Sequence, residues 1–108
     1  MELHLVRVVL ENTDNRNQEI KLDVVIDGRT AKGGLEYFGV WQDRHEDVRC
    51  PFVLGPDGTV DFGTGYDGAD RYYETNIGNL ELIIGQQVGW RNENGEQTFR
   101  ISGITPLL

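Results

Sequence analysis

The stretch that decides the fold is residues 52–62, which read FVLGPDGTVDF. Its centre, residues 55–58, is Gly-Pro-Asp-Gly, with proline where a type I turn needs φ of about −65° and glycine where a left-handed bulge residue follows. Allowing for the bulge places Leu54 opposite Val60 and sets the two terminal phenylalanines against each other. Without the bulge an aspartate would face Phe52, so the hydrophobic pattern predicts a bulged β-hairpin.

A second β-hairpin is predicted over residues 86–104, with its turn at Asn94-Gly95. Asn-Gly favours a type I′ turn, which needs positive φ at both central residues. Counting outward from this turn gives the cross-strand pairs Glu93–Glu96, Arg91–Thr98, Trp90–Phe99 and Val88–Ile101. Burying the four apolar side chains is worth roughly 1.5–3 kcal/mol each. That gain exceeds the repulsion between two glutamates at an exposed turn, so we expect burial to set the register.

Residues 2–10 and 19–27 are predicted to form a further strand pair. Ile20, Leu22 and Val24 alternate with mostly polar neighbours, which is the period of a half-buried strand. The stretch 2–10 carries apolar side chains on both faces, and this indicates a central strand that is buried on both sides. The polar residues 12–17 are expected to form the connecting loop.

Three other segments complete the expected secondary structure. Residues 71–76 and 80–84 are predicted strands separated by Gly78-Asn79. Residues 35–42 are ambiguous between helix and strand, and we favour a strand because Gly39 interrupts the segment and its neighbours are β. The sequence thus predicts one all-β domain over residues 1–108, a small antiparallel sandwich or barrel of about seven or eight short strands with at most one short helix.

Charge limits the kinds of partner. The 108 residues include 10 Lys plus Arg and 18 Asp plus Glu, for a formal net charge of −8. Nucleic acids and anionic membranes are bound through Lys and Arg, so both are disfavoured as partners. A protein partner of basic character is expected instead. No apolar stretch reaches the ~18 residues of a membrane span, and the first ten residues carry no export signal, so we expect a cytoplasmic protein.

The acidic, glycine-rich segment 57–70 is the strongest candidate for a metal site. Calcium binds six to eight oxygen ligands, many of them from carboxylates. Counted from Asp57 as an EF-hand loop, however, the required glycine and glutamate positions hold Phe62 and Gly68. A repeat-in-toxin site would need tandem copies, and only one copy is present. We therefore expect weak or absent calcium binding, with these aspartates serving turns or facing solvent, and no cofactor.

No catalytic motif is found in the sequence. The single cysteine, Cys50, cannot form an internal disulfide, and it is expected to be a small buried side chain. His45 lies five residues earlier, but this spacing does not require a Cys-His pair. The prediction is a non-enzyme. An enzyme that uses His45, Cys50 or the carboxylates of residues 61–70 is a weaker alternative.

Surface aromatics complete the functional hypothesis. Trp41, Tyr66 and one of Tyr72 and Tyr73 are candidate surface anchors, because strand alternation should bury only one of the two adjacent tyrosines. We predict a small acidic non-catalytic protein-binding domain, an inhibitor, immunity-type or accessory factor that docks on a basic partner. A calcium- or carbohydrate-binding module centred on residues 57–73 is the alternative. The candidate binding residues are Trp41, Asp61, Tyr66, Asp67, Asp70 and Glu74.

Overall fold

The computed structural model describes residues 2–108, which form a closed antiparallel β-barrel of eight strands with one short extra strand. The strands are β1 (Leu3–Asn12), β2 (Gln18–Asp27), β3 (Thr30–Ala31), β4 (Tyr37–Asp43), β5 (Val48–Leu54), β6 (Thr59–Asp61), β7 (Tyr72–Thr75), β8 (Gln87–Asn92) and β9 (Gly95–Pro106). Their order is β1-β9-β8-β7-β6-β5-β4-β2-β3, and β1 also pairs with β2. Apart from the short β3, each strand is therefore hydrogen-bonded to its neighbours in the sequence. The predicted all-β class is confirmed, and the sandwich-or-barrel alternative is resolved as a barrel.

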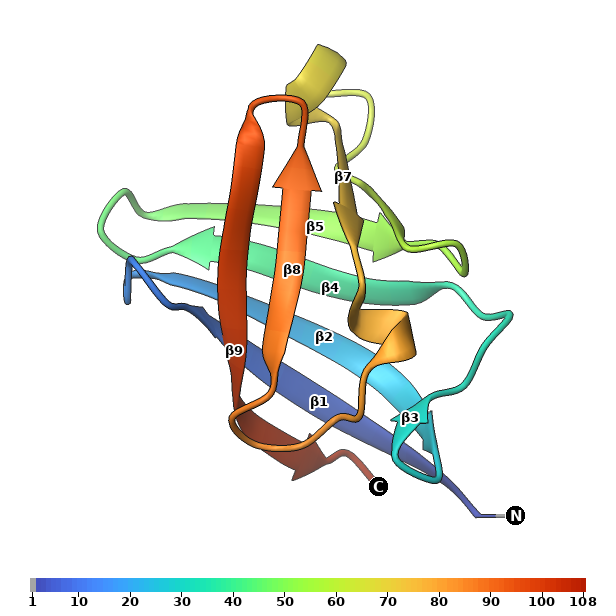
Figure 1. The fold of residues 1–108 in the computed structure, drawn as a ribbon. Helices are drawn as coiled ribbons and strands as arrows, with labels where there is room; N and C mark the ends of the chain where they lie inside the picture. Colours follow the sequence, from blue (N-terminus) through green and yellow to red (C-terminus); the bar gives the residue numbers. More distant parts are fainter. Residues whose placement is uncertain (1) are drawn as a thin grey trace.

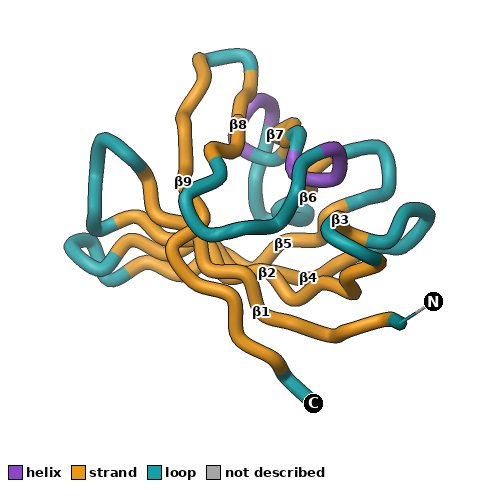
Figure 2. The backbone as a smooth tube through the Cα atoms, turned by 60° about the horizontal axis from the view of Figure 1, so that its bottom comes forward, coloured by secondary structure: helices purple, strands orange, loops and turns teal. Residues whose placement is uncertain are grey.

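The barrel is flattened into two layers that cross at a steep angle. In Figure 1, β1, β2, β4 and β5 lie side by side at the back, and β7, β8 and the first part of β9 cross in front of them. Figure 2, turned toward the bottom of the molecule, shows the same two layers. The last part of β9 bends away from β8 to pair with β1, after a register irregularity between Val9 and Leu10 of β1. This bend lets one strand belong to both layers.

The core lies between the layers, and strand alternation selects its members. Val8 of β1, Leu22 of β2 and Val88 of β8 are fully buried, and Phe99 and Ile101 of β9 complete the centre. An eight-stranded barrel has an interior narrow enough for side chains to fill, or to hold one small ligand.

The hairpin at residues 55–58 has the predicted bulged register. Leu54 lies opposite Val60, and the ladder ends one pair further on, at Val53 and Asp61. Gly58 has φ +90, and a Cβ at this position would lie 2.7 Å from the carbonyl oxygen of Thr75. Only glycine meets both conditions without strain.

The register predicted for the second hairpin is wrong. Asn92 pairs with Gly95, so the turn lies at Glu93-Asn94, and Trp90 lies opposite Gln97 instead of Phe99. Compared with the predicted register, one strand is shifted along the other by a whole side-chain period, so the same apolar residues still share one face. Hydrophobic patterning therefore cannot distinguish the two registers. The Asn92 side chain accepts a hydrogen bond from the Asn94 N–H at 2.9 Å, which favours the earlier turn.

The first strand pair is confirmed, with one correction. β1 pairs antiparallel with β2 and is flanked on its other side by β9, so it is central. It is buried on one face only, because Leu3 is 48% exposed and Leu5 and Val9 are half-buried. The barrel has a single interior, and within residues 2–108 no second sheet covers the outer face of the back layer.

Of the three other predicted strands, two are present in the structure and one is not. Residues 37–43 are a strand, as favoured, and Tyr72–Thr75 form β7. Residues 80–84 are not a strand: Leu82 is buried and its N–H donates to the carbonyl of Arg29 at 2.7 Å. Ile83 and Ile84 that follow are exposed, so this segment closes the barrel end as an irregular loop.

Helical structure in residues 2–108 is limited to two 3₁₀ turns of three residues, η1 (Gly68–Asp70) and η2 (Ile77–Asn79). Within this range the chain forms no helix of the length and apolarity that a membrane span requires.

Candidate functional site

A cavity of about 220 Å³ opens toward the end of the barrel that carries the 62–71 loop and η1, which lies at the top of Figure 1. We call it the aromatic pocket. Its lining residues are Trp41, Cys50, Phe62, Tyr66, Asp70, Tyr73, Trp90 and Gln97. Pockets for drug-sized ligands measure roughly 300–1,000 Å³. The aromatic pocket is smaller than that and suits one small molecule or one inserted side chain.

Phe62 is the centre of the aromatic wall. Its ring centroid lies 6.0 Å from that of Tyr66 and 5.5 Å from that of Tyr73, at interplanar angles of 63° and 78°. Tyr73 in turn lies 6.2 Å from Trp90. Edge-to-face contacts of this kind fix ring orientation. Trp41, from β4, joins no such ring pair within residues 2–108, and it contributes the part of the lining that comes from the back layer.

Trp90 has an unpaired polar group although the residue is only 3% exposed. No hydrogen bond within residues 2–108 uses its indole N–H. Across the same residues, no unbonded side-chain nitrogen or oxygen is fully shielded from solvent, so the small exposed part of Trp90 includes this N–H. Buried tryptophans usually have a hydrogen-bond partner for the indole nitrogen. Trp90 lines the pocket, and none of the hydrogen bonds found within residues 2–108 uses its N–H.

Asp70 is the one Asp or Glu residue of the pocket lining. It is the last residue of the turn η1 and is exposed, and no ion pair joins it to another residue in the range 2–108. The neighbouring Arg71 is engaged elsewhere. Its Nε donates to Asp61 at 3.0 Å, and its guanidinium lies 4.8 Å from the ring centre of Tyr72. The pocket rim therefore carries a negative charge, and its lining includes no Lys, Arg or His.

Cys50 and Tyr66 are joined inside the pocket, with 3.1 Å between the thiol sulfur and the phenol oxygen. This hydrogen bond is the main cause of a raised pKa at Tyr66. The pKa of Tyr73 is also raised, first by burial and then by the charge of Asp70. Both phenols therefore stay neutral at physiological pH.

The proposed cysteine–histidine pair does not form a hydrogen bond in the structure. His45 is exposed in the turn between β4 and β5, where its backbone N–H donates to Asp43 at 2.9 Å. Cys50 points instead toward Tyr66 and is 7% exposed, in keeping with the predicted buried position.

The predicted site residues separate into two groups. Trp41, Tyr66 and Asp70 line the aromatic pocket, and Asp67 is exposed in the same loop. Asp61 and Glu74 lie outside it, paired with Arg71 and Arg91 at 3.0 and 2.9 Å. The prediction missed Cys50, Phe62, Tyr73, Trp90 and Gln97 as site residues. The sequence pattern assigned Cys50 and Trp90 to buried positions, left Tyr72 and Tyr73 as alternatives, and gave no signal for Gln97.

The carboxylates of residues 57–70 do not converge on one point. Asp57 accepts hydrogen bonds from the N–H and hydroxyl of Thr59, which lower its pKa. Asp61 accepts from Arg71 and from the N–H of Gly63, and both contacts lower its pKa. Within residues 2–108 no three His, Cys, Asp or Glu side chains are arranged to hold a metal ion.

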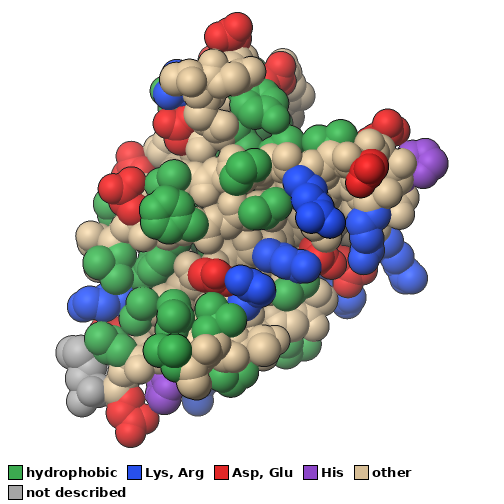
Figure 3. Space-filling model, turned by 180° about the vertical axis from the view of Figure 1, so that it is seen from behind, with side chains coloured by type: hydrophobic (Ala, Val, Ile, Leu, Met, Phe, Trp, Pro, Cys, Tyr) green, Lys and Arg blue, Asp and Glu red, His purple; other side chains and the backbone are tan. Residues whose placement is uncertain are grey.

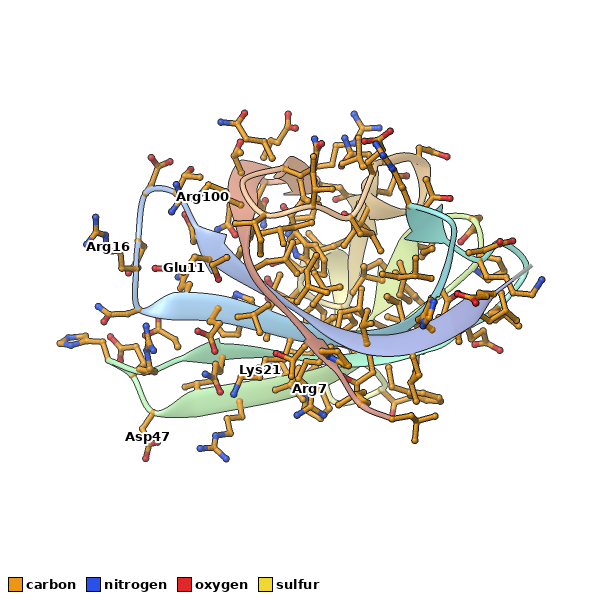
Figure 4. The ribbon with its side chains drawn as sticks, turned by 90° about the horizontal axis from the view of Figure 1, so that it is seen from below. Arg7, Glu11, Arg16, Lys21, Asp47 and Arg100 are labelled. Carbon is orange, nitrogen blue, oxygen red and sulfur yellow. The ribbon has the colours of Figure 1, made fainter. Side chains whose placement is uncertain are left out.

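Cations of this acidic chain gather on a different face. Figure 3 shows Lys and Arg side chains across the outer face of the back layer, where Arg7, Lys21 and Arg49 line a shallow groove with the 69%-exposed Phe38. In Figure 4, Arg7 and Lys21 point away from the barrel interior. Arg7 is paired with Asp23 at 2.8 Å. The charge of −8 is therefore unevenly distributed, and the pocket lies away from these cations.

Comparisons with protein-family models, with curated proteins and with solved structures give no match to this chain. What the chain binds is therefore inferred from the chemistry of the barrel and its pocket.

Proposed function

We propose that this chain is a non-catalytic binding domain that takes one small organic molecule in the aromatic pocket. The observation that carries the proposal is the unbonded indole N–H of the buried Trp90 among four other aromatic side chains. Aromatic faces supply apolar contact area, and a few polar groups fix the orientation of a ligand. Tyr73, Gln97 and Asp70 supply such groups here.

This proposal develops the ligand-binding alternative that the sequence suggested around residues 57–73. Phe62, Tyr66, Asp70 and Tyr73 all come from that segment. The calcium version has little support, because Asp57 and Asp61 are bonded to separate partners and no three carboxylates within residues 2–108 are arranged to hold an ion. In the carbohydrate version the ligand is uncharged: a hydroxylated ring would stack on the aromatic wall and form hydrogen bonds with the polar groups.

Two further parts of the proposal concern chemistry and location. A nucleophile needs an adjacent base, and Cys50 is bonded to Tyr66 and not to His45, which supports binding without catalysis. A single unpaired thiol in a chain of this size supports a reducing compartment, the cytoplasm.

Tryptophan fluorescence tests the proposal directly, because both tryptophans line the pocket. The probes are choline, D-glucose and p-cresol, which represent a cation, a polyol and an aromatic ring. We expect saturable quenching by at least one probe, weakened in Trp41→Leu and unchanged in Phe38→Ala on the outer face of the back layer. If none of the three changes the emission or the melting temperature at millimolar concentration, the proposal is overturned.

Docking on a basic protein is a second candidate function, of the inhibitor or accessory type. It is supported by Asp67 and Asp70, which are exposed and form no ion pair within residues 2–108. Complementary charge accelerates encounter between proteins. Polylysine serves as the cationic probe, and we expect Asp67→Asn with Asp70→Asn to weaken its binding. The control removes two charges elsewhere, by Glu46→Gln with Asp47→Asn. Equal effects of the two double variants would mean that the charge at residues 67 and 70 selects no partner.

A further inference from the structure

We propose that the aromatic pocket recognises a methylated ammonium group, a cation whose charge is spread over N-methyl groups. This inference rests on the proposed function and specifies its ligand class. It combines the shape of the aromatic wall, the charge at the rim and the small number of hydrogen-bond acceptors in the lining.

The aromatic wall has the shape that such a cation needs. Phe62 meets Tyr66 at 63° and Tyr73 at 78°, so these rings are steeply inclined to one another and do not form one flat surface. Trp41 and Trp90 add two indoles, the ring type with the most favourable cation–π interaction. A compact cation placed among them can contact several ring faces at once.

The charge at the rim favours a cation. Asp70 is the only Asp or Glu among the eight lining residues, which include no Lys, Arg or His. Arg71, the next residue, is held by Asp61 at 3.0 Å and does not neutralise it. The net charge of −8 adds a field that attracts cations to the surface. An anionic ligand would be repelled by the same charges.

The lining also distinguishes between kinds of cation. A primary ammonium carries three N–H donors, each of which needs an acceptor, and a calcium ion needs six to eight oxygens. The lining is mostly aromatic: its side-chain oxygen acceptors are those of Asp70, Gln97, Tyr66 and Tyr73, and the Tyr66 hydroxyl is already bonded to Cys50. A fully methylated ammonium has no N–H groups and needs only apolar contact and a nearby negative charge. The free N–H of Trp90 would in addition bond to an oxygen on the ligand.

The test compares choline with 3,3-dimethyl-1-butanol, which has the same shape but carries carbon in place of the charged nitrogen. Binding is followed by tryptophan fluorescence and by calorimetry. We expect choline to bind at least about tenfold more tightly than the alcohol, since desolvated cation–π contacts and a carboxylate favour the charge. Asp70→Asn should weaken choline binding several-fold and leave binding of the alcohol unchanged.

Asp67→Asn is the matched control, because it removes the same charge from the same loop at a position outside the pocket lining. It should leave choline affinity nearly unchanged. Circular dichroism checks that each variant is folded, and Trp41→Phe should retain more choline affinity than Trp41→Leu. Binding of a peptide that carries one trimethyllysine is measured in the same way. Tighter binding of that peptide than of choline would identify the ligand as a protein side chain, and the reverse would identify a free cation.

Two results would overturn the inference, and they are distinguishable. If the neutral alcohol or D-glucose binds as tightly as choline, the pocket binds small molecules but does not recognise the charge. If no probe binds, the proposed function fails as well.

Discussion

Gly39 of β4 shows how one residue can fix the packing between two strands. A Cβ at this position would lie 2.5 Å from Cζ of Phe52 and 2.8 Å from the backbone oxygen of Lys21. Phe52 is buried and cannot move aside without disturbing the core. We expect Gly39→Ala to cost about 1–3 kcal/mol of unfolding free energy, as overpacking does. Gly65→Ala, where no atom lies within 4 Å, is the control, and equal urea midpoints for the two variants would contradict the packing argument.

Trp90 contributes to stability as well as to the pocket. Its ring contacts Phe52 at 5.4 Å and Phe99 at 6.0 Å between centroids. Trp90→Ala should cost about 3–5 kcal/mol, the range for large-to-small changes in a core. Tyr72→Ala, at a position 47% exposed, should cost much less. An unchanged denaturation midpoint for Trp90→Ala would mean that the indole is not part of the core.

Three tyrosines with raised pKa values predict how stability depends on alkaline pH. Folding raises the pKa of Tyr37, Tyr66 and Tyr73 above the ordinary value of 10.0. A raised pKa in the folded state gives stability that is present below pH 10 and is lost as the pH rises through the folded pKa values. The melting temperature should therefore fall as the pH rises above 10.0. Tyr73→Phe should make this fall shallower, and a slope identical to that of the unaltered chain would refute the assignment.

At the level of elements, the two hairpins show what local sequence specifies. Gly55-Pro56-Asp57-Gly58 sets the turn and the register together, because Pro56 fixes φ and Gly58 supplies φ +90. Asn94-Gly95 gave the right hairpin and the right buried face but the wrong register. Registers that differ by one full side-chain period bury the same residues, so weaker interactions decide between them.

Reversing the charge of residue 96 tests the register of the second hairpin. In the structure Arg91 lies opposite Glu96, whereas the register expected from the sequence sets Glu93 opposite Glu96. Glu96→Lys should therefore destabilise the chain by about 0.2–1 kcal/mol, because it places like charges across the strands. In the other register the same change would be stabilising. The sign of the change in urea midpoint distinguishes the two registers. The turn variant Glu93→Lys is the comparison.

The pocket could be predicted only in part, for a related reason. Trp41, Tyr66 and Asp70 were expected at a binding site, and all three line the cavity. Alternation correctly placed Trp90 inward, but it cannot tell a side chain packed in the core from one that borders a cavity. That difference depends on how the ends of β4, β5, β8 and β9 come together with the 62–71 loop, and those segments are far apart in sequence.

At the scale of the whole molecule, one pairing closes the barrel. β1 and β9 come from opposite ends of the chain and lie side by side (Figure 1), and the N–H of Leu107 also donates to the carbonyl of Leu5 at 3.0 Å. The same bend in β9 that reaches β1 also positions its first half beside β8, where Gln97 lines the pocket. Stability and the binding site therefore depend on the same strand.

Removing residues 103–108 tests this dependence. The deletion eliminates four β1–β9 pairs, those of Val6, Arg7, Val8 and Val9, together with Ile104, which packs against the core. Lost strand hydrogen bonds at about 0.5–1.5 kcal/mol each and the exposed apolar surface should together cost about 3–6 kcal/mol.

Removing only residues 107–108 keeps every β1–β9 pair and is the matched control. The melting temperature of the longer deletion should fall far below that of the control, and its tryptophan emission should shift to the red as the pocket end of β9 loosens. If the two deletions melt together, the three β1–β9 pairs that remain, those of Leu10, Glu11 and Asn12, are enough to close the barrel, and the part of the seam formed by residues 103–106 would be dispensable for folding.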